Sequence, residues 1–160
     1  MGDASVGIGG GIGGATGNST GGPVTSVLAL VSPEPLVAAR FEDFALSQRD
    51  GALVSFRGVV RDHDRGAAVT ALDYEAHPDA EEFLRRCCEE VSASTGLTVA
   101  AGHRVGSLVV GDTALVACVA ASHRAEAFAA CERLVDRIKL EVPIWKRQHL
   151  SGGVTQWVGL

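Results

Sequence analysis

The chain has 160 residues, of which 46% are hydrophobic and 21% charged, a composition typical of one soluble globular domain. The formal net charge of −5 at pH 7 excludes a general attraction to nucleic acid or an anionic membrane, so an anion site must be a local cluster of cations. No apolar run reaches the roughly 20 residues that span a bilayer, and the N-terminus lacks the pattern of a secretory signal. We therefore expect a cytoplasmic protein.

Residues 1–24 are dominated by glycine, with alanine, serine and threonine, and offer almost no side chain to bury. They are predicted to form a disordered tail, and residues 25–160 the folded domain. The GIGGGIGG motif in the tail does not indicate a phosphate-binding loop, because no strand pattern precedes it and no Gly-Lys-Ser/Thr follows.

The first half of the domain alternates strand and helix patterns. Residues 27–31 predict a strand, residues 36–48 an amphipathic helix and residues 52–60 a second strand. A charged loop at residues 61–66 leads to a strand at residues 69–75. A hairpin around this loop is the simplest connection between those two strands.

A second helix is predicted to start at His77–Pro78–Asp79 and to end at Gly96. Residues 97–105 and 108–121 are strand material, and the latter run should break or turn at Gly111–Asp112. Hairpins and helices thus alternate without regular β-α-β units. This order predicts an α+β domain with a mostly antiparallel sheet and helices packed on it.

Ser122 is the predicted N-cap of the last long helix, and residues 154–158 are predicted to close the domain as an edge strand. The buried stripe of that helix is predicted to comprise Phe128, Cys131, Leu134, Val135 and Ile138.

The helix should end just before a proline that lies between two lysines. Pro143 lacks an N–H and disfavours a helical Val142, so we expect the helix to stop near residues 139–141 and an extended segment to carry Lys146. Lys139, at the end of the helix, and Lys146, on the extended segment, would then both point into one pocket, with Trp145 as an apolar anchor. The alternative for this stretch alone is a solvated helix end, where cations complement the helix dipole.

Two cations also lie where that helix begins. His123 and Arg124 in the first turn oppose the helix dipole, but beside free backbone N–H groups they make a good anion receptor. A surface arginine in solvent is the alternative. Residues 123 and 139 are separated by sixteen steps of about 1.5 Å each, too far to share one small ligand. If both ends are functional, a dimer could bring one subunit's first turn to the other's lysines.

Arg61 follows an apolar strand, where polar side chains commonly line sites, although for this residue alone a solvent-facing hairpin loop is the favoured interpretation. His63 has the same standing. His103, within a strand, is interpreted as structural, and Asp112 as a turn residue. The four cysteines form no Cys-x-x-Cys pair, so buried free thiols are expected rather than disulfides or a zinc site.

Several of these blocks resemble one known family. Residues 54–63 (VSFRGVVRDH), Ser122–His123–Arg124 and residues 139–147 (KLEVPIWKR) are similar to the large, catalytic subunits of molybdopterin synthase, the MoaE family. Residues 103–108 (HRVGSL), followed by Gly111–Asp112, resemble that family's linker between central strands. The matching blocks recur in the same order with similar gaps and cover nearly everything outside the glycine-rich tail.

The resemblance implies an α/β hammerhead-type fold and a cytoplasmic heterotetramer. Two large subunits would form a central homodimer, and a small ubiquitin-like subunit with a C-terminal Gly-Gly thiocarboxylate would donate the sulfur. The implied activity is a sulfurtransferase that converts cyclic pyranopterin monophosphate, a pterin phosphate, into the dithiolene of molybdopterin. No cofactor and no metal are implied.

Carried over by position, the resemblance makes Lys139 the essential lysine and Lys146 the second catalytic lysine of the pocket. It assigns substrate binding to Arg61, His123, Arg124, Lys139, Lys146, Arg147 and Gln148, with the His-Arg pair supplied across the dimer interface. The sequence departs from the family at Arg57, where an apolar or small residue is expected, and at Ile144, where an aromatic is usual.

Two other functions use the same cations. A lyase would use Lys139 as a Schiff-base nucleophile on a carbonyl substrate, and a trapped adduct without any partner would identify it. A non-catalytic module would bind a phosphate or another anion at the cationic cluster without turnover.

Overall fold

The computed structural model describes residues 26–64, 66–151 and 153–159. The predicted disordered tail at residues 1–24 and its GIGGGIGG motif lie outside the described residues. Within them, no helix is long and apolar enough to cross a membrane.

A four-stranded sheet forms the centre of the molecule, in the order β1 (Val27–Ser32), β5 (Val99–Arg104), β7 (Thr113–Ala121) and β2 (Ala52–Val59). β1 and β5 are parallel, and the other two pairings are antiparallel. β7 is buried along nearly its whole length, because helices cover both faces of the sheet.

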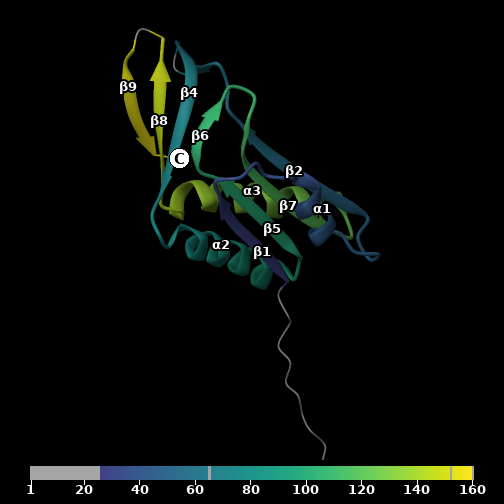
Figure 1. The fold of residues 1–160 in the computed structure, drawn as a ribbon. Coiled ribbons are helices and arrows are strands. Elements are labelled where there is room, and N and C mark those ends of the chain that lie inside the picture. Colours follow the sequence, from purple (N-terminus) through teal and green to yellow (C-terminus); the bar gives the residue numbers. More distant parts are fainter. Residues whose placement is uncertain (1–25, 65, 152, 160) are drawn as a thin grey trace, which may run out of the picture.

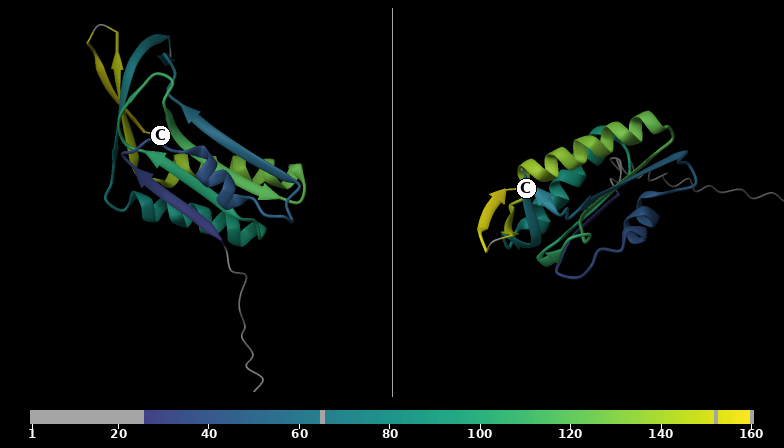
Figure 2. Two further views of the ribbon diagram at one scale, coloured as in Figure 1. Left: turned by 45° about the vertical axis from the view of Figure 1, so that its right-hand side comes forward. Right: turned by 90° about the horizontal axis from the view of Figure 1, so that it is seen from above.

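Helices α2 (Ala80–Thr95) and α3 (Arg124–Glu141) lie side by side on one face, and the short α1 (Ala38–Ala45) covers the other (Figures 1 and 2). Successive side chains of a strand point to opposite faces of the sheet, so each face has its own hydrophobic core. Leu115, Ala117 and Val119 pack with α2 and α3, whereas Val116 and Cys118 pack with α1.

A second sheet stands at one end of the first (Figure 1). It is built in the order β3 (His63–Asp64), β4 (Ala67–Ala76), β8 (Ile144–Leu150) and β9 (Thr155–Gly159), and β6 (Gly106–Val109) pairs with β4. All of its pairings are antiparallel. The predicted α+β class with mostly antiparallel sheets is therefore confirmed.

The helix ends follow local rules read from the sequence. Gly96 adopts φ +74° at the end of α2, a left-handed conformation that costs glycine little. α3 ends at Glu141, Val142 is extended before Pro143, and Lys146 lies on β8, as predicted.

The predicted hairpin between residues 52–60 and 69–75 is wrong. β2 pairs with β7 in the first sheet, and β4 pairs with β6 and β8 in the second. Only the two-residue β3 folds back on the start of β4. The charged loop is thus a crossover between the two sheets.

Four further details of the sequence interpretation need correction. Ser122 is not the N-cap of α3: His123 takes that position with extended backbone and no side-chain capping bond. Phe128 is 62% exposed instead of buried, and Trp145 is 45% exposed, so it anchors nothing in the core. α1 is shorter than the predicted helix at residues 36–48. The other four residues of the predicted α3 stripe are buried as expected.

Candidate active site

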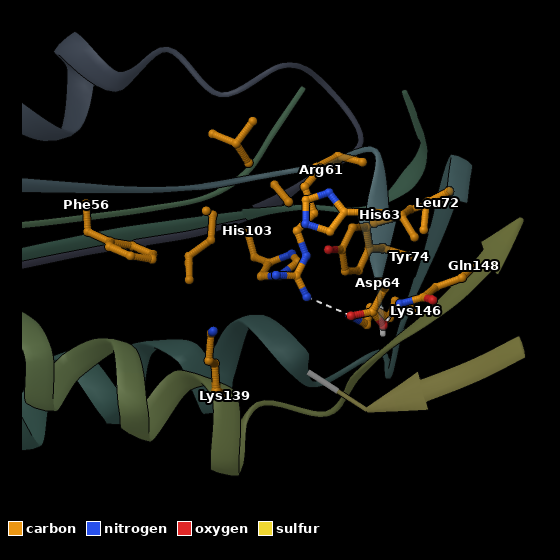
Figure 3. A pocket seen from close by; sticks show the side chains of 16 residues that line it. Phe56, Arg61, His63, Asp64, Leu72, Tyr74, His103, Lys139, Lys146 and Gln148 are labelled. Atoms are coloured by element: carbon orange, nitrogen blue, oxygen red, sulfur yellow. Dashed lines mark hydrogen bonds and ion pairs between the residues drawn. The ribbon is translucent and has the colours of Figure 1, made fainter. Parts of the chain in front are cut away.

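A cavity of about 330 Å³ lies where the two sheets meet, beside the end of α3. Side chains from seven elements or their flanking loops line it, and Figure 3 shows them. Those that bear on its chemistry are Phe56, Arg61, His63, Asp64, Tyr74, His103, Lys139, Lys146 and Gln148.

Lys139 and Lys146 both line this cavity, although they come from a helix and a strand. Lys139 is in the last turn of α3 and points toward the cavity from below in Figure 3. They are the only lysines in the sequence, and every other cationic side chain apart from histidine is arginine. Both lysine ammonium groups of the sequence therefore line the cavity.

Side chains of β8 alternate between its two faces, and this determines which of them lie on the same face as Lys146. Ile144 and Gln148 are buried on its side of the strand, and Gln148 lines the cavity. Arg147 lies on the other face, where Nη2 donates to Asp73 Oδ2 at 3.0 Å and the guanidinium lies 5.3 Å from the Trp157 ring. The structure therefore does not bring Arg147 into this cavity.

Asp64 links two polar side chains of the cavity wall, Arg61 and Gln148. Its Oδ1 accepts a hydrogen bond of 2.6 Å from Arg61 Nη2, and its Oδ2 accepts one of 2.8 Å from Gln148 Nε2. The Gln148 bond, the Arg61 bond and the charge of Lys146 hold the pKa of Asp64 below its usual value. Asp64 is therefore a carboxylate that orients Arg61 and Gln148 within the site.

His103 and Tyr74 form the inner wall. Their rings meet edge to face with centroids 5.1 Å apart, and His103 is 2% exposed. Its Nδ1 donates to the Arg104 carbonyl oxygen at 2.8 Å. Burial lowers the pKa of His103 to about 4, so the ring is neutral at pH 7.

His123 and Arg124 lie at the opposite end of α3 from Lys139 and do not line the cavity. This placement agrees with the length of the helix, about 1.5 Å for each of its residues. A single chain thus brings together four of the predicted site residues, namely Arg61, Lys139, Lys146 and Gln148, and leaves His123, Arg124 and Arg147 elsewhere.

The cysteines are buried free thiols, as predicted. Burial raises the pKa of Cys87 to about 11, of Cys88 to about 12 and of Cys131 to about 11. These thiols stay protonated at pH 7 and are poor nucleophiles. Among residues 26–64, 66–151 and 153–159, no group of three His, Cys, Asp or Glu side chains could hold a metal ion.

A family model described as MoaE protein matches residues 31–141. The chain belongs to the MoaE family. The molybdopterin synthase catalytic subunit of Staphylococcus carnosus is 38% identical over 128 residues, which cover 79% of this chain and 85% of that protein. The resemblance read from the sequence motifs is thereby confirmed.

Solved structures of the MoaE family share the fold. The crystal structure of molybdopterin synthase from Staphylococcus aureus superposes with a TM-score of 0.76 at 33% identity, over 83% of this chain and 97% of that one. A structure from Helicobacter pylori, described as a complex of subunits 1 and 2 of molybdopterin-converting factor, superposes with a TM-score of 0.63 at 17% identity. The match covers 81% of this chain and 88% of that one. At that identity the likeness concerns the fold alone.

The two departures from the family motifs leave the cavity intact. Arg57 is exposed between Phe56 and Gly58, which line the cavity, so alternation directs it away. Ile144 is buried in the main core.

Sequence reasoning missed Asp64. It interpreted His103 as structural, and the structure shows a buried ring that also lines the cavity. Asp64 belongs to the charged loop at residues 61–66, and its position three residues after Arg61 was a signal for an ion pair. Nothing local shows that His103 lines a cavity, because that depends on Tyr74 and α3 closing around it.

Proposed function

We propose that this MoaE-family chain is the catalytic subunit of a molybdopterin synthase, a sulfurtransferase in molybdenum cofactor biosynthesis. The observation that carries the proposal is the convergence of both lysines of the sequence, from α3 and β8, on one cavity with Arg61. The names of the relatives support the reaction, since they are catalytic subunits of this synthase.

The proposed substrate is cyclic pyranopterin monophosphate, and the proposed sulfur donor is a thiocarboxylate. Both are anions that repel each other in water. Arg61, Lys139 and Lys146 would neutralise them in one cavity and so favour their approach. Lys139 would exchange the proton that is needed when sulfur bonds to the substrate carbon and the phosphate ring opens.

The sulfur donor is proposed to be the C-terminal Gly-Gly of a small ubiquitin-like subunit. Lys139 is exposed in the chain alone, so the cavity is open beside the end of α3. An extended glycine tail carries no side chains and can thread a narrow opening. Docking of this partner would also remove Lys139 from water.

A homodimer within a heterotetramer would complete the site. His123 and Arg124 begin α3 beside the Ala52 end of β2, whereas the cavity lies at the Val59 end. β2 is an edge strand of its sheet, so two copies can lie antiparallel along it. That arrangement would bring the first turn of α3 from one copy toward the lysines of the other. The buried free thiols support a reducing, cytoplasmic location.

Reconstitution tests the function. The purified protein is mixed with thiocarboxylated small subunit and cyclic pyranopterin monophosphate, and molybdopterin is measured for wild type and for Lys139→Ala, Lys139→Arg and Arg133→Ala. We expect no product from Lys139→Ala. Lys139→Arg should still bind the anions but lose at least about 100-fold in turnover, because arginine keeps its proton.

Arg133→Ala is the matched control, because Arg133 is an exposed cation on the same helix and its guanidinium binds Ser94 outside the cavity. It should turn over like wild type. No product from wild type with bound partner would contradict the proposal and favour an anion-binding module. A borohydride-trapped carbonyl adduct on Lys139 without the partner would instead favour the lyase.

A further inference from the structure

Tyr74, the only tyrosine in the sequence, lines the cavity from β4. It is opposite Lys146 in the register between β4 and β8, so both side chains leave the same face of the second sheet. In Figure 3 the ring extends from β4 with its hydroxyl oxygen toward the interior of the cavity. A hydroxyl group is thus placed in the cavity that the cations of the site also line.

Apolar contacts hold the Tyr74 ring in this position. The side chain packs against the main core and against the smaller cluster that contains Leu72 and Leu108. Its ring also meets the His103 ring edge to face, with centroids 5.1 Å apart. An aromatic ring makes these contacts without a hydroxyl group, so a phenylalanine at this position would keep them.

The hydroxyl of Tyr74 is a neutral hydrogen-bond donor. Burial raises the pKa of Tyr74, so its O–H keeps its proton at pH 7. A phenol has one proton and two lone pairs, and it can therefore accept an N–H from a neighbouring side chain and still donate to a ligand. Arg61, Lys139 and Lys146 attract an anion through their charge. Tyr74 adds a directional bond to the anion that needs no charge on the protein.

We propose that Tyr74 is a substrate-binding residue whose O–H donates a hydrogen bond to an anionic oxygen of the ligand in the cavity. The inference rests on the proposed function and deepens it. Two reactants bring such an oxygen, namely the phosphate of the pterin and the C-terminal thiocarboxylate of the small subunit. The contribution of a neutral donor should persist at high salt, whereas the contribution of an exposed cation such as Arg61 is screened.

The substitution Tyr74→Phe removes only the hydroxyl oxygen. The experiment measures KM for cyclic pyranopterin monophosphate and for the thiocarboxylated small subunit at low and high salt, together with the melting temperature. We expect KM for at least one of the two reactants to rise by about 10-fold to 100-fold, as for the loss of a hydrogen bond to a charged group. The factor should be equal at both salt concentrations, and the melting temperature should stay at the wild-type value.

Arg61→Gln is the matched comparison, because it removes a charge from the same cavity. Its factor in KM should shrink at high salt. For Tyr74→Phe, a larger rise for the pterin phosphate identifies the phosphate as the acceptor, and a larger rise for the small subunit identifies the thiocarboxylate. Unchanged KM values for both reactants, or a rise that comes with a lower melting temperature, would overturn the inference and leave the proposed function standing.

A second readout does not depend on turnover. Because Tyr74 is the only tyrosine, labelling this chain with 13C at tyrosine Cζ gives a single signal, which belongs to Tyr74. The signal should shift when the reactant that Tyr74→Phe weakens is bound, and stay in place with chloride at the same ionic strength. Absence of turnover in the wild-type complex would overturn the proposed function. The signal then decides the inference alone, with inorganic phosphate and acetate as probes, and no shift with either would overturn it.

Discussion

Each polar side chain of the cavity has a distinct chemical role that follows from its surroundings. Lys139 and Lys146 supply ammonium groups, Arg61 supplies a guanidinium group, and Asp64 holds Arg61 in place. His103 is neutral because it is buried. The cavity thus combines cationic groups, a carboxylate and a neutral imidazole within a space of about 330 Å³.

The buried neutral ring of His103 makes stability depend on pH. Its pKa is about 4 in the folded chain and 6.5 as the ordinary value, so the unfolded chain binds the proton more tightly. The stability it contributes is complete above pH 6.5 and is lost as pH falls toward 4, by about 3 kcal/mol. We expect chemical unfolding of wild type to show this loss and His103→Gln to lack it. Equal pH slopes in both proteins would contradict the prediction.

Asp64 places a negative charge in a cavity proposed to bind anions. Asp64→Asn should keep an acceptor for Arg61 but remove this repulsion, so we expect KM for the anionic substrate to fall by about threefold to tenfold at low salt and less at high salt. Steady-state kinetics at two ionic strengths would measure it.

The matched control for that variant is Asp62→Asn. Asp62 lies in the same loop with a side chain 77% exposed, does not line the cavity, and changes the net charge equally. It should leave KM near the wild-type value. A rise in KM for Asp64→Asn would instead mean that holding Arg61 in place matters more than the repulsion.

At the scale of elements, α1 is packed on the sheet through a glycine. A Cβ on Gly102 would lie 2.8 Å from Phe41 Cε1 and 3.3 Å from Leu36 Cδ2, on the face of β5 opposite the cavity. We expect Gly102→Ala to lower the free energy of unfolding by about 1–3 kcal/mol and to leave KM unchanged. Denaturant unfolding and kinetics would measure both.

A double mutant tests the cause of that loss. Phe41→Leu shortens the side chain that the new methyl group would meet. Gly102→Ala combined with Phe41→Leu should therefore cost less than the sum of the two single changes. If the losses of unfolding free energy are additive, the contact with Phe41 is not the cause of the destabilisation by Gly102→Ala.

The junction between α3 and β8 is the element-scale feature that builds the cavity. Pro143 ends the helix within two residues of Glu141, and β8 then pairs with β4 from Ile144 onward. The chain turns from helix to strand between the two lysines, and this turn, rather than helical spacing, brings them to one cavity.

At the scale of the whole molecule, the single chain leaves His123 and Arg124 far from the lysines. If a second copy supplies them, a mixed dimer of Lys139→Ala and Arg124→Ala subunits contains one intact site. Each homodimer should be inactive, and the mixed dimer should recover about half of wild-type turnover. No recovery in a verified mixed dimer would show that the two residues act within one chain or not at all.

The sequence by itself determined the features that local physics controls. Pro143 forced the end of α3, Gly96 supplied the left-handed end of α2, and alternation put Lys146 and Gln148 on one side of a strand. The order of its motifs also identified the family. These signals act within a few residues, so they can be read without knowledge of the rest of the chain.

Only the tertiary structure decided which strands pair and what each side chain faces. β2 and β4 are close in sequence yet enter different sheets: β2 pairs with β7 along its whole length, and β4 pairs with β6 and β8. Phe128 has helical spacing for the core but points away from it. The roles of Asp64 and His103 arise from partners contributed by distant segments, and pairings of this kind depend on how the whole chain packs.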